Sequence, residues 1–334
     1  MSQKLPSEPL LFEPLFQERI WGGRQLAQWG FTLPQGVTIG EVWALVDRPE
    51  AQSVVAEGSD PRFVGKSLHQ LWQEEREEVF GEVYCSHPAE RFPLLLKLLD
   101  ATQRLSLQVH PPEEIALLLG GEPKTECWYV LEAAPGAVVY AGVAQGVTQE
   151  LFLKGLEEGS LEELLSKIPV KVGDALVLPS GRLHSLGEGV VVVEVQQNSD
   201  TTYRVFDWNR CNGQGQQREL HLKEALKAID FEDQEPQVTP QYLQGGLDAI
   251  SEGGLLLAET AYFLVTKRGL QGAVKLDLSG RFALLTCLKG EVCVRNQTIS
   301  AGETMLLPAS LGEVVLSSGT EVEFLWTRLP QDAL

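Results

Sequence analysis

Two short stretches of the chain read GDALVLP, at Gly173–Pro179, and GETMLLP, at Gly302–Pro308. In each, a glycine–acid turn leads into an apolar run that a proline closes. This pattern is typical of a strand that starts at a tight turn and stops at a sheet edge. Strand-like segments precede each stretch, and another apolar strand-like segment follows it. The sequence therefore carries a weak internal repeat of one β unit.

The repeated unit is typical of a cupin jelly roll. The 334 residues include 32 glycines and 18 prolines, and short Val- and Leu-rich runs lie between turn residues, which predicts many short strands. We expect a mainly β protein of two cupin (jelly-roll) domains with a small helical insertion. The expected catalytic domain spans residues 1–232. A polar, Pro/Gly-rich linker at 233–246 leads to a degenerate second copy at 247–334.

Helical periodicity interrupts the β pattern at four places. The expected helices are an acidic one at Leu68–Tyr84, a short one at Glu113–Leu119, one or two at Thr148–Lys167, and one at Glu219–Ile229. The first three define insertions at about 66–90, 111–120 and 148–168 of the catalytic domain.

Composition excludes several classes of function. A net charge of −19 argues against binding to nucleic acid or to anionic membranes, and an anionic substrate would need local cations at its site. No apolar run approaches the roughly 18 residues of a membrane helix. The N-terminal segment lacks the features of a signal peptide, which predicts a cytoplasmic protein. The five cysteines form no CxxC pair, and we expect buried free thiols.

The two copies differ where a metal site would lie. His184 follows Gly173 by eleven residues, whereas Glu313 takes the corresponding place after Gly302. The second copy contains no histidine at all. A metal site that needs imidazole is therefore possible only in the first copy.

The first copy brings several metal-binding residue types together. Gln108 and His110 stand at i and i+2 of a strand-like segment and share one face, as Lys124 and Glu126 do in the next segment. His184 falls in the turn after the GDALVLP stretch. Two imidazoles and a carboxylate, completed by a side-chain amide or water, fit a catalytic zinc site with an exchangeable position.

A single histidine in a strand is more often structural, so the interpretation as a metal site rests on the imidazoles and the carboxylate together. We expect His69 and His87 at the surface and His221 at a helix start.

Seven further segments occur in an order that resembles a known family. They are ERIWGG (18–23), IGEVW (39–43), FPLLLKLLDA (92–101), LSLQVHP (105–111), KTECWYVL (124–131), the GD…LPSGRLHSLG run (173–187) and EVQQNSDTTYRVFDWNR (194–210). In this order they resemble the type I mannose-6-phosphate isomerases of the short bacterial form, from the N-terminal strands through about Ala228.

The resemblance implies one zinc ion per chain. Its implied ligands are Gln108, His110, Glu126 and His184. Arg204 is implied as a catalytic residue, Lys124 lies beside the metal, and Glu194 is on a strand that leads towards Arg204. The family usually has Pro-Asp-Asp after the metal histidine, whereas this chain has Pro-Pro-Glu at 111–113. This difference affects substrate positioning and leaves the expected ligands intact.

The implied reaction interconverts mannose 6-phosphate and fructose 6-phosphate by moving a proton between C1 and C2 through a cis-enediol. Glu194 is the first candidate for the base, and a zinc-bound hydroxide is the second. Lys97, Lys124, Arg204 and zinc would form the local positive pocket that a sugar phosphate needs. Structural alternatives remain for two of these residues: Arg204 could pair with Asp200 or Asp207, and Lys124 could be an exposed lysine at a strand start.

Three other functions stay open on the sequence alone. The chain could be an isomerase of another sugar phosphate, or a metal-dependent cupin oxygenase, although an oxygenase prefers iron in an open facial triad. A catalytically silent sugar-phosphate-binding protein is the alternative from a different class. The expected partner is a small sugar phosphate, and the expected assembly is a monomer or a homodimer.

Overall fold

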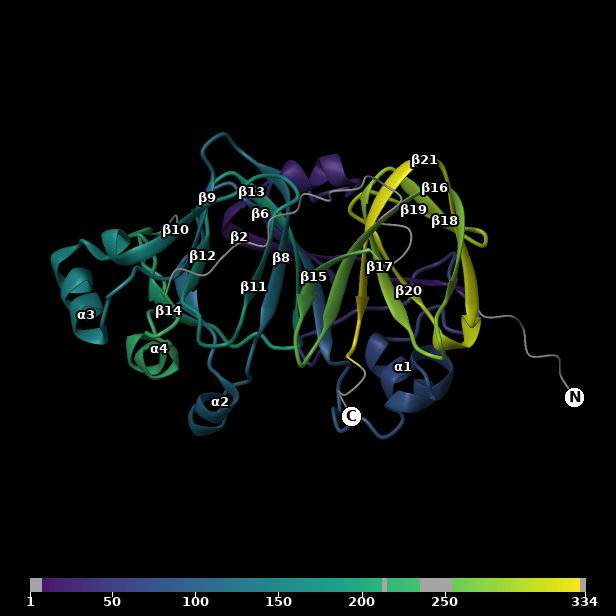
Figure 1. Cartoon of the computed structure of the whole chain (residues 1–334), viewed down its shortest axis with the longest axis horizontal. Helices are drawn as coiled ribbons and strands as arrows, with labels where there is room; N and C mark the ends of the chain where they lie inside the picture. Colours follow the sequence, from purple (N-terminus) through teal and green to yellow (C-terminus); the bar gives the residue numbers. More distant parts are fainter. Residues whose placement is uncertain (1–7, 212–214, 235–253, 331–334) are drawn as a thin grey trace, which may run out of the picture.

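The computed structural model describes residues 8–211, 215–234 and 254–330, and it is mainly β, as predicted. Three sheets stand side by side along the long axis of the molecule (Figure 1). The middle sheet has the order β11 (Ala175–Leu178), β8 (Glu126–Ala133), β13 (Val190–Gln197), β6 (Leu94–Ala101), β3 (Ile39–Leu45) and β2 (Leu15–Gly23). On one side lies a five-stranded sheet of β10 (Leu165–Pro169), β9 (Val138–Val143), β12 (His184–Leu186), β7 (Leu107–Val109) and β14 (Tyr203–Phe206).

The third sheet holds the C-terminal strands. Its order is β1 (Leu10–Leu11), β20 (Thr304–Leu307), β17 (Ala283–Lys289), β21 (Glu313–Arg328), β16 (Leu264–Asp277) and β15 (Leu255–Glu259). Two further strands, β18 (Glu291–Val294) and β19 (Gln297–Ser300), branch from β21, and β4 (Asp47–Arg48) pairs with β5 (Ala51–Gln52) separately. Because β1 belongs to this sheet, the N-terminal segment and the C-terminal strands are joined by backbone hydrogen bonds.

The middle sheet is buried on both faces. All eight residues of β6, LLLKLLDA, are buried, and side chains of a strand point alternately to its two faces. Leu94, Leu96 and Leu98 share an apolar cluster with residues of the C-terminal sheet. Leu99 and Ala101 belong to a second cluster, which they share with residues of the five-stranded sheet. The inward positions of the middle sheet therefore face a space between two sheets, where the candidate site lies.

The predicted repeat is visible in the backbone of both turns. Gly173 and Gly302 each have φ +93°, a conformation that favours glycine. Gly173 N–H donates to the carbonyl of Val130 and Gly302 N–H to that of Cys287, both at 2.9 Å. In each turn the carboxylate that follows the glycine accepts from a backbone N–H three residues earlier. The two turns are thus the same structure, which β11 and β20 continue.

The helices agree with the predictions in part. The described helices are α1 (Leu68–Glu74), α2 (Glu113–Leu119), α3 (Gln149–Glu158) and α4 (Leu222–Ala228), with short turns η1 (Gln25–Trp29), η2 (Arg76–Phe80), η3 (Glu82–Tyr84), η4 (Leu161–Leu164) and η5 (Ala309–Leu311). The acidic helix starts at Leu68 as predicted but is broken into α1, η2 and η3. The backbone leaves the helical conformation at Glu75, between α1 and η2, and at Gly81, which has φ +118°, between η2 and η3. The prediction that helix extends to Lys167 was wrong, because β10 starts at Leu165 and pairs with β9.

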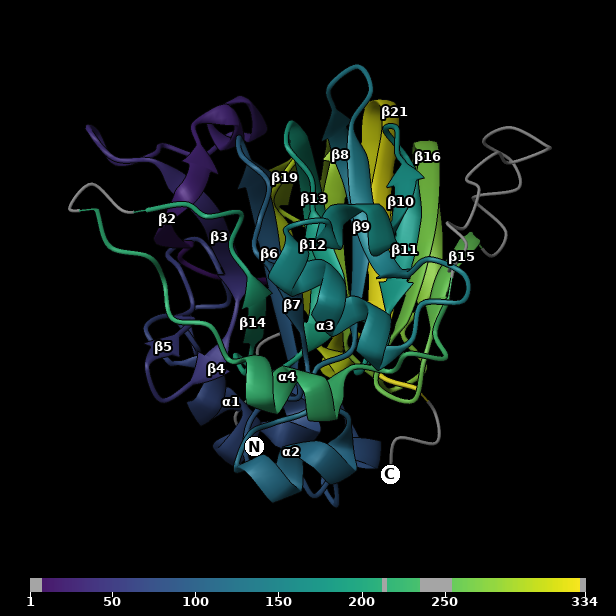
Figure 2. The same ribbon diagram turned by 90° about the vertical axis from the view of Figure 1, so that its left-hand side faces the viewer.

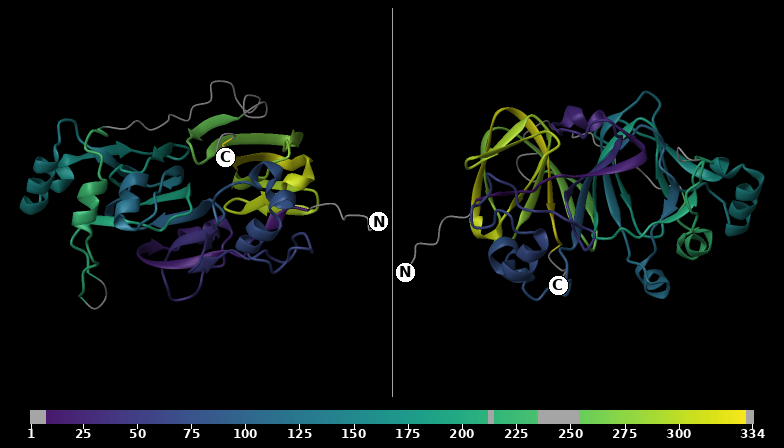
Figure 3. Two further views of the ribbon diagram at one scale, coloured as in Figure 1. Left: turned by 90° about the horizontal axis from the view of Figure 1, so that it is seen from below. Right: turned by 180° about the vertical axis from the view of Figure 1, so that it is seen from behind.

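The helices lie outside the sheets. Figure 2 shows α3 and α4 in front of the five-stranded sheet, and both views of Figure 3 show the blue α1 region beside the yellow C-terminal strands. Phe80 of η2 packs against Phe282, at 5.3 Å between ring centroids.

The expected boundaries at 232 and 247 remain predictions, and most of the expected linker lies outside the described residues.

Two smaller expectations have clear outcomes. All five cysteines are free, but only Cys127 and Cys287 are buried, whereas Cys85 and Cys211 are exposed and Cys293 is intermediate. The prediction of buried thiols was therefore wrong for Cys85, Cys211 and Cys293. Within the described ranges, no helix is long and apolar enough to cross a membrane.

The aromatic contact between η2 and the C-terminal sheet predicts a stability effect. Phe80 is fully buried and packs against Trp72, Phe92 and Phe282. Phe80→Ala should lower the free energy of unfolding by about 3–5 kcal/mol through lost burial and a residual cavity. Urea unfolding measures this. Leu117→Ala, at a position that is 80% exposed, is the control and should change stability by less than about 0.5 kcal/mol; equal effects would contradict the packing account.

Candidate metal centre and adjoining cavity

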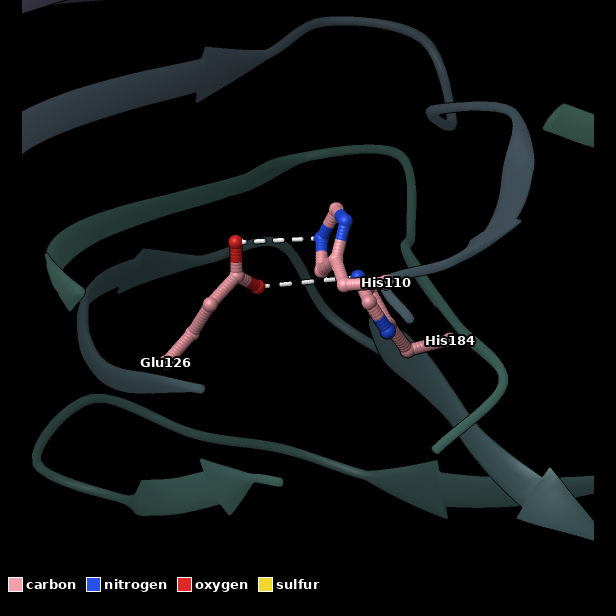
Figure 4. Close-up of side chains that lie close together, drawn as sticks. All are labelled: His110, Glu126 and His184. Atoms are coloured by element: carbon pink, nitrogen blue, oxygen red, sulfur yellow. Dashed lines mark ion pairs between the residues drawn. The ribbon is translucent and has the colours of Figure 1, made fainter. Parts of the chain in front are cut away.

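His110, Glu126 and His184 form a compact buried cluster (Figure 4). One ligand atom from each lies within 4.8 Å of the other two. The Nε2 atom of His110 is 3.2 Å from Oε1 of Glu126, and Nε2 of His184 is 3.5 Å from Oε2. Each residue is about 1% exposed. Both carboxylate oxygens therefore face an imidazole nitrogen in a space closed to bulk water.

Strand geometry brings the three residues together from two sheets. Glu126 is the first residue of β8, in the middle sheet, and the alternation of β8 directs it inward with Trp128. His184 begins β12 in the facing sheet, and its register partner there is Gln108 of β7. His110 follows the end of β7 by one residue. The cluster thus spans the space between the sheets.

Hydrogen bonds on the far side of each ring fix the imidazole tautomers. Nδ1 of His110 is 2.8 Å from the carbonyl of Thr201, and Nδ1 of His184 is 2.8 Å from that of Arg182. A carbonyl only accepts, so each Nδ1 carries the proton and each Nε2 keeps a free lone pair. Burial lowers the pKa of both rings, that of His184 to about 3, so both are neutral at pH 7.

The donor set fits a metal ion on the evidence of its unpaired atoms. Nε2 of His110 and Oε2 of Glu126 are buried without a hydrogen-bond partner, and Oε1 of Glu126 has the Lys124 ammonium at 2.8 Å. Burial would raise the pKa of Glu126, but the charge of the Lys124 ammonium outweighs it and holds that pKa well below the usual range. Two neutral imidazoles and one carboxylate, with their lone pairs converging, form the set of ligands that divalent zinc prefers. A carbonyl behind each ring is the usual orienting partner of a metal-binding histidine.

Gln108 lies at the edge of the cluster. Its Nε2 is 3.3 Å from Nε2 of His184, and its Oε1 is 3.4 Å from Oγ of Ser106. Turning the amide by 180° exchanges its oxygen and nitrogen, which place equal demands on space. The side chain of Gln108 therefore lies beside the cluster, and its role as a ligand stays a prediction.

A cavity of about 400 Å³ adjoins the cluster. Its lining includes the predicted Gln108, Lys124, Glu194 and Arg204, as well as Lys97. The remaining lining residues are Arg19, Trp21, Glu41, Leu99, Leu105, Ser106, Trp128, Asp200, Thr202 and Arg218. The wall thus carries five cations and three carboxylates, in a protein whose net charge is −19.

Lys124 is buried, so the alternative of an exposed strand-start lysine was wrong. Its Nζ lies 2.8 Å from Oε1 of Glu126, and its side chain is 5% exposed. Burial would lower the pKa of Lys124, but the carboxylates of Glu126 and Glu194 outweigh it and raise that pKa. Lys124 therefore stays cationic beside the candidate ligands.

Glu194 is buried on β13 and points into the same space. Nε1 of Trp128 donates to its Oε2 at 2.7 Å, and Nζ of Lys97 is 3.6 Å from its Oε1. Burial and then the charge of Glu126 raise the pKa of Glu194 to about 7. Its protonation state therefore changes near neutral pH.

Arg204 of β14 faces the cavity from the opposite sheet to Glu194. Its Nη1 donates to the carbonyl of Glu219 at 2.7 Å, and its buried Nε has no partner. Asp207 instead binds Arg210 and Arg218, each at 2.5 Å, so the predicted alternative of an Arg204–Asp207 pair was wrong. Arg204 thus presents a guanidinium to the cavity without a carboxylate partner in the described part of the chain.

Comparison with known proteins identifies the family. The model of the phosphomannose isomerase type I catalytic domain matches residues 10–126. Mannose-6-phosphate isomerase ManA of Bacillus subtilis (strain 168) is 38% identical over 323 residues, which are 95% of this chain and 98% of that protein. The chain belongs to the type I phosphomannose isomerase family.

Solved structures of this family share the fold. The crystal structure of the mannose 6-phosphate isomerase from Bacillus subtilis has a TM-score of 0.81 at 32% identity, and the match covers 96% of this chain and all of that one. A mannose 6-phosphate isomerase bound with zinc and yttrium has a TM-score of 0.71 at 16% identity, over 96% of this chain and 99% of the other. The latter similarity supports the fold alone.

Three charged residues of the cavity wall were not predicted from the sequence. Arg19, Glu41 and Arg218 line the wall, but none lies near the predicted ligands in the sequence. Their segments reach the cavity through sheet pairing and through the Asp207 contact. The sequence signals were that Arg19 stands within the ERIWGG segment and Glu41 within the IGEVW segment. His69 and His87 lie outside the cluster and are partly buried, and His221 precedes α4 as predicted.

The converging lone pairs predict that the protein binds a metal ion through His110, Glu126 and His184. His184→Ala should reduce the bound divalent metal of the zinc-loaded, dialysed protein to background, since it removes one of the two imidazoles. Elemental analysis measures the metal, and circular dichroism checks the fold. His69→Ala, which removes a histidine outside the cluster, should retain the metal. Full metal content in His184→Ala would contradict the assignment.

Proposed function

We propose that this chain is a metal-dependent mannose-6-phosphate isomerase that interconverts mannose 6-phosphate and fructose 6-phosphate. The observation that carries the proposal is the buried cluster of unpaired donors at the wall of a cation-rich cavity. Membership of the type I family and the name of its Bacillus subtilis relative support the same reaction. An isomerase needs a proton carrier, an electrophile and a site for the phosphate, and the cavity offers a candidate for each.

We further propose that the metal is one zinc ion per chain, held by His110, Glu126, His184 and the amide oxygen of Gln108. Imidazole and carboxylate are common zinc ligands, and a relative of the same fold is described as bound with zinc. When bound, the metal would polarise the substrate's carbonyl or hydroxyl oxygen as a Lewis acid. Lys124 would keep the neighbouring Glu126 ionised and place a second cation near that oxygen.

Glu194 is the proposed proton carrier. It would take the proton from C2 of the aldose and return it to C1, through the cis-enediol. The indole N–H of Trp128 fixes one carboxylate oxygen and leaves the other without a hydrogen bond, so that this oxygen is free to accept a proton.

The cations in the cavity wall would offset the repulsion between an anionic substrate and the negatively charged protein. A sugar phosphate dianion is repelled by a protein of net charge −19, so its site must be locally positive. Arg204 is proposed as a catalytic residue that binds the enediolate or the phosphate through its planar guanidinium. Arg218 lines the same cavity and is held by Asp207.

The remaining expectations stay proposals. They are a cytoplasmic location, a monomer or homodimer, and a small sugar phosphate as partner, with neither nucleic acid nor membrane. The alternative of a silent sugar-phosphate-binding protein is less favoured, because a binding protein has no need for a proton carrier beside a metal cluster.

Turnover by the purified protein tests the proposal. The conversion of mannose 6-phosphate to fructose 6-phosphate should stop after chelation and return when zinc is restored. Activity that persists in metal-free protein would contradict the metal dependence. Tight binding of the sugar phosphate without turnover by the zinc-loaded protein would favour the silent alternative.

The proposed role of Glu194 predicts a pH dependence. The raised pKa of Glu194 means that its carboxylate becomes protonated near pH 7. A metal on Glu126 would cancel part of the charge that raises this pKa and would move the protonation to a somewhat lower pH. Activity should therefore fall as pH decreases through this range. Glu194→Gln should lower kcat roughly 100-fold or more and abolish this limb of the pH profile. Full turnover by this variant would eliminate Glu194 as the base.

A further inference from the structure

The inward face of the middle sheet carries a row of side chains that pair across four strands. Trp43 of β3 is the register partner of Lys97 of β6, Lys97 that of Glu194 of β13, and Glu194 that of Trp128 of β8. Side chains directly opposite each other on one sheet face are near neighbours. The backbone register therefore places the buried ammonium of Lys97 between Trp43 and Glu194.

Lys97 stands midway between two carboxylates. Its Nζ is 3.6 Å from Oε2 of Glu41 and 3.6 Å from Oε1 of Glu194. Both distances are ion-pair separations beyond hydrogen-bond length, although the side chain is only 5% exposed. Among the described residues Lys97 thus has two carboxylates at equal distance and no hydrogen-bond partner, while it lines the cavity.

Glu41 is anchored much more firmly than Glu194. Its Oε1 accepts from Nε of Arg19 at 2.8 Å, and its Oε2 accepts from the indole of Trp43 at 2.6 Å. Burial would raise the pKa of Glu41, but Lys97 and Arg19 outweigh it and lower that pKa to about 2. Trp43 also places its ring 5.0 Å from Nζ of Lys97. Glu41 is therefore a fixed anion on the side of Lys97 away from Glu194.

We propose that Glu41 is a positioning residue for the proposed isomerase reaction: held by Arg19 and Trp43, it balances the attraction of Glu194 and keeps the Lys97 ammonium free in the cavity wall. Without the charge of Glu41, Lys97 would move onto Glu194. That contact would occupy the proton donors of Lys97 and tie up the oxygen of Glu194 that is otherwise unbonded. The inference rests on the proposed function, because the cost appears only if Lys97 and Glu194 act on substrate.

The consequence is a loss of turnover more than of binding. Glu41→Gln keeps the size of the side chain and removes its charge, and we expect kcat to fall roughly 10- to 100-fold, the cost of a misplaced group. KM should change less than about threefold and the metal content should stay the same. Asp100→Asn is the matched control: Asp100 is a buried carboxylate on β6, the strand of Lys97, that accepts from the backbone N–H of Gln25 and does not line the cavity.

A double-mutant cycle tests whether Glu41 acts through Lys97. In the Lys97→Met background, Glu41→Gln should cost less than about threefold further in kcat, because the group that it positions is gone. Penalties that multiply would show that the two residues act independently and would overturn the proposal. Loss of metal in Glu41→Gln would also overturn it, since the residue would then support the ligands.

A milder variant covers the case in which Glu41→Gln does not fold. Trp43→Phe keeps a ring beside Lys97 and removes only the N–H that binds Glu41, so kcat should fall in the same direction by a smaller factor. Unchanged kcat in each folded variant of this pair would overturn the inference. Absence of mannose-6-phosphate turnover in the zinc-loaded wild-type protein would instead reject the proposed function itself.

Discussion

Burial of the middle sheet on both faces is the constraint on which the rest of the structure depends. One face packs on the C-terminal strands through residues such as Leu96 and Val193, and it must be apolar. The other face looks toward the five-stranded sheet, where it can carry charge only if each charge has a partner. Strand alternation separates the two demands residue by residue, so that one buried strand such as β6 contributes both core leucines and Lys97.

Compensation of buried charge explains the composition of the cavity. Glu126 faces Lys124 and two imidazoles, and Lys97 is shared by Glu41 and Glu194. Removing charges from water is costly, and mutual attraction offsets that cost only when the geometry is good. Around the cluster and the cavity, the buried atoms left without a hydrogen bond include Nε2 of His110, Oε2 of Glu126, Oε1 of Glu194 and Nε of Arg204. These are the atoms that the proposed metal and substrate would satisfy, whereas the fully bonded Glu41 is part of the framework.

The sequence predicted the candidate metal ligands because their signals are local. Gln108 and His110 share a strand face, Glu126 starts the next strand, and the contrast of His184 with Glu313 follows from a repeated turn. Arg19, Glu41 and Arg218 could not be found in this way, since they reach the cavity by the pairing of distant strands and by an ion pair. Pairing with a distant strand also explains why the helix was wrongly expected to reach Lys167. Leu165–Pro169 forms a strand because it pairs with β9.

X-ray absorption at the zinc edge tests the central claim most directly, because it reports the ligands around the metal. The account predicts one zinc per chain with nitrogen and oxygen neighbours at about 2.0–2.2 Å and the multiple-scattering signature of two imidazoles. In His184→Ala any zinc that remains should show a single imidazole. Zinc coordinated by sulfur, or a spectrum unchanged by this substitution, would contradict the assignment of the cluster as the metal centre.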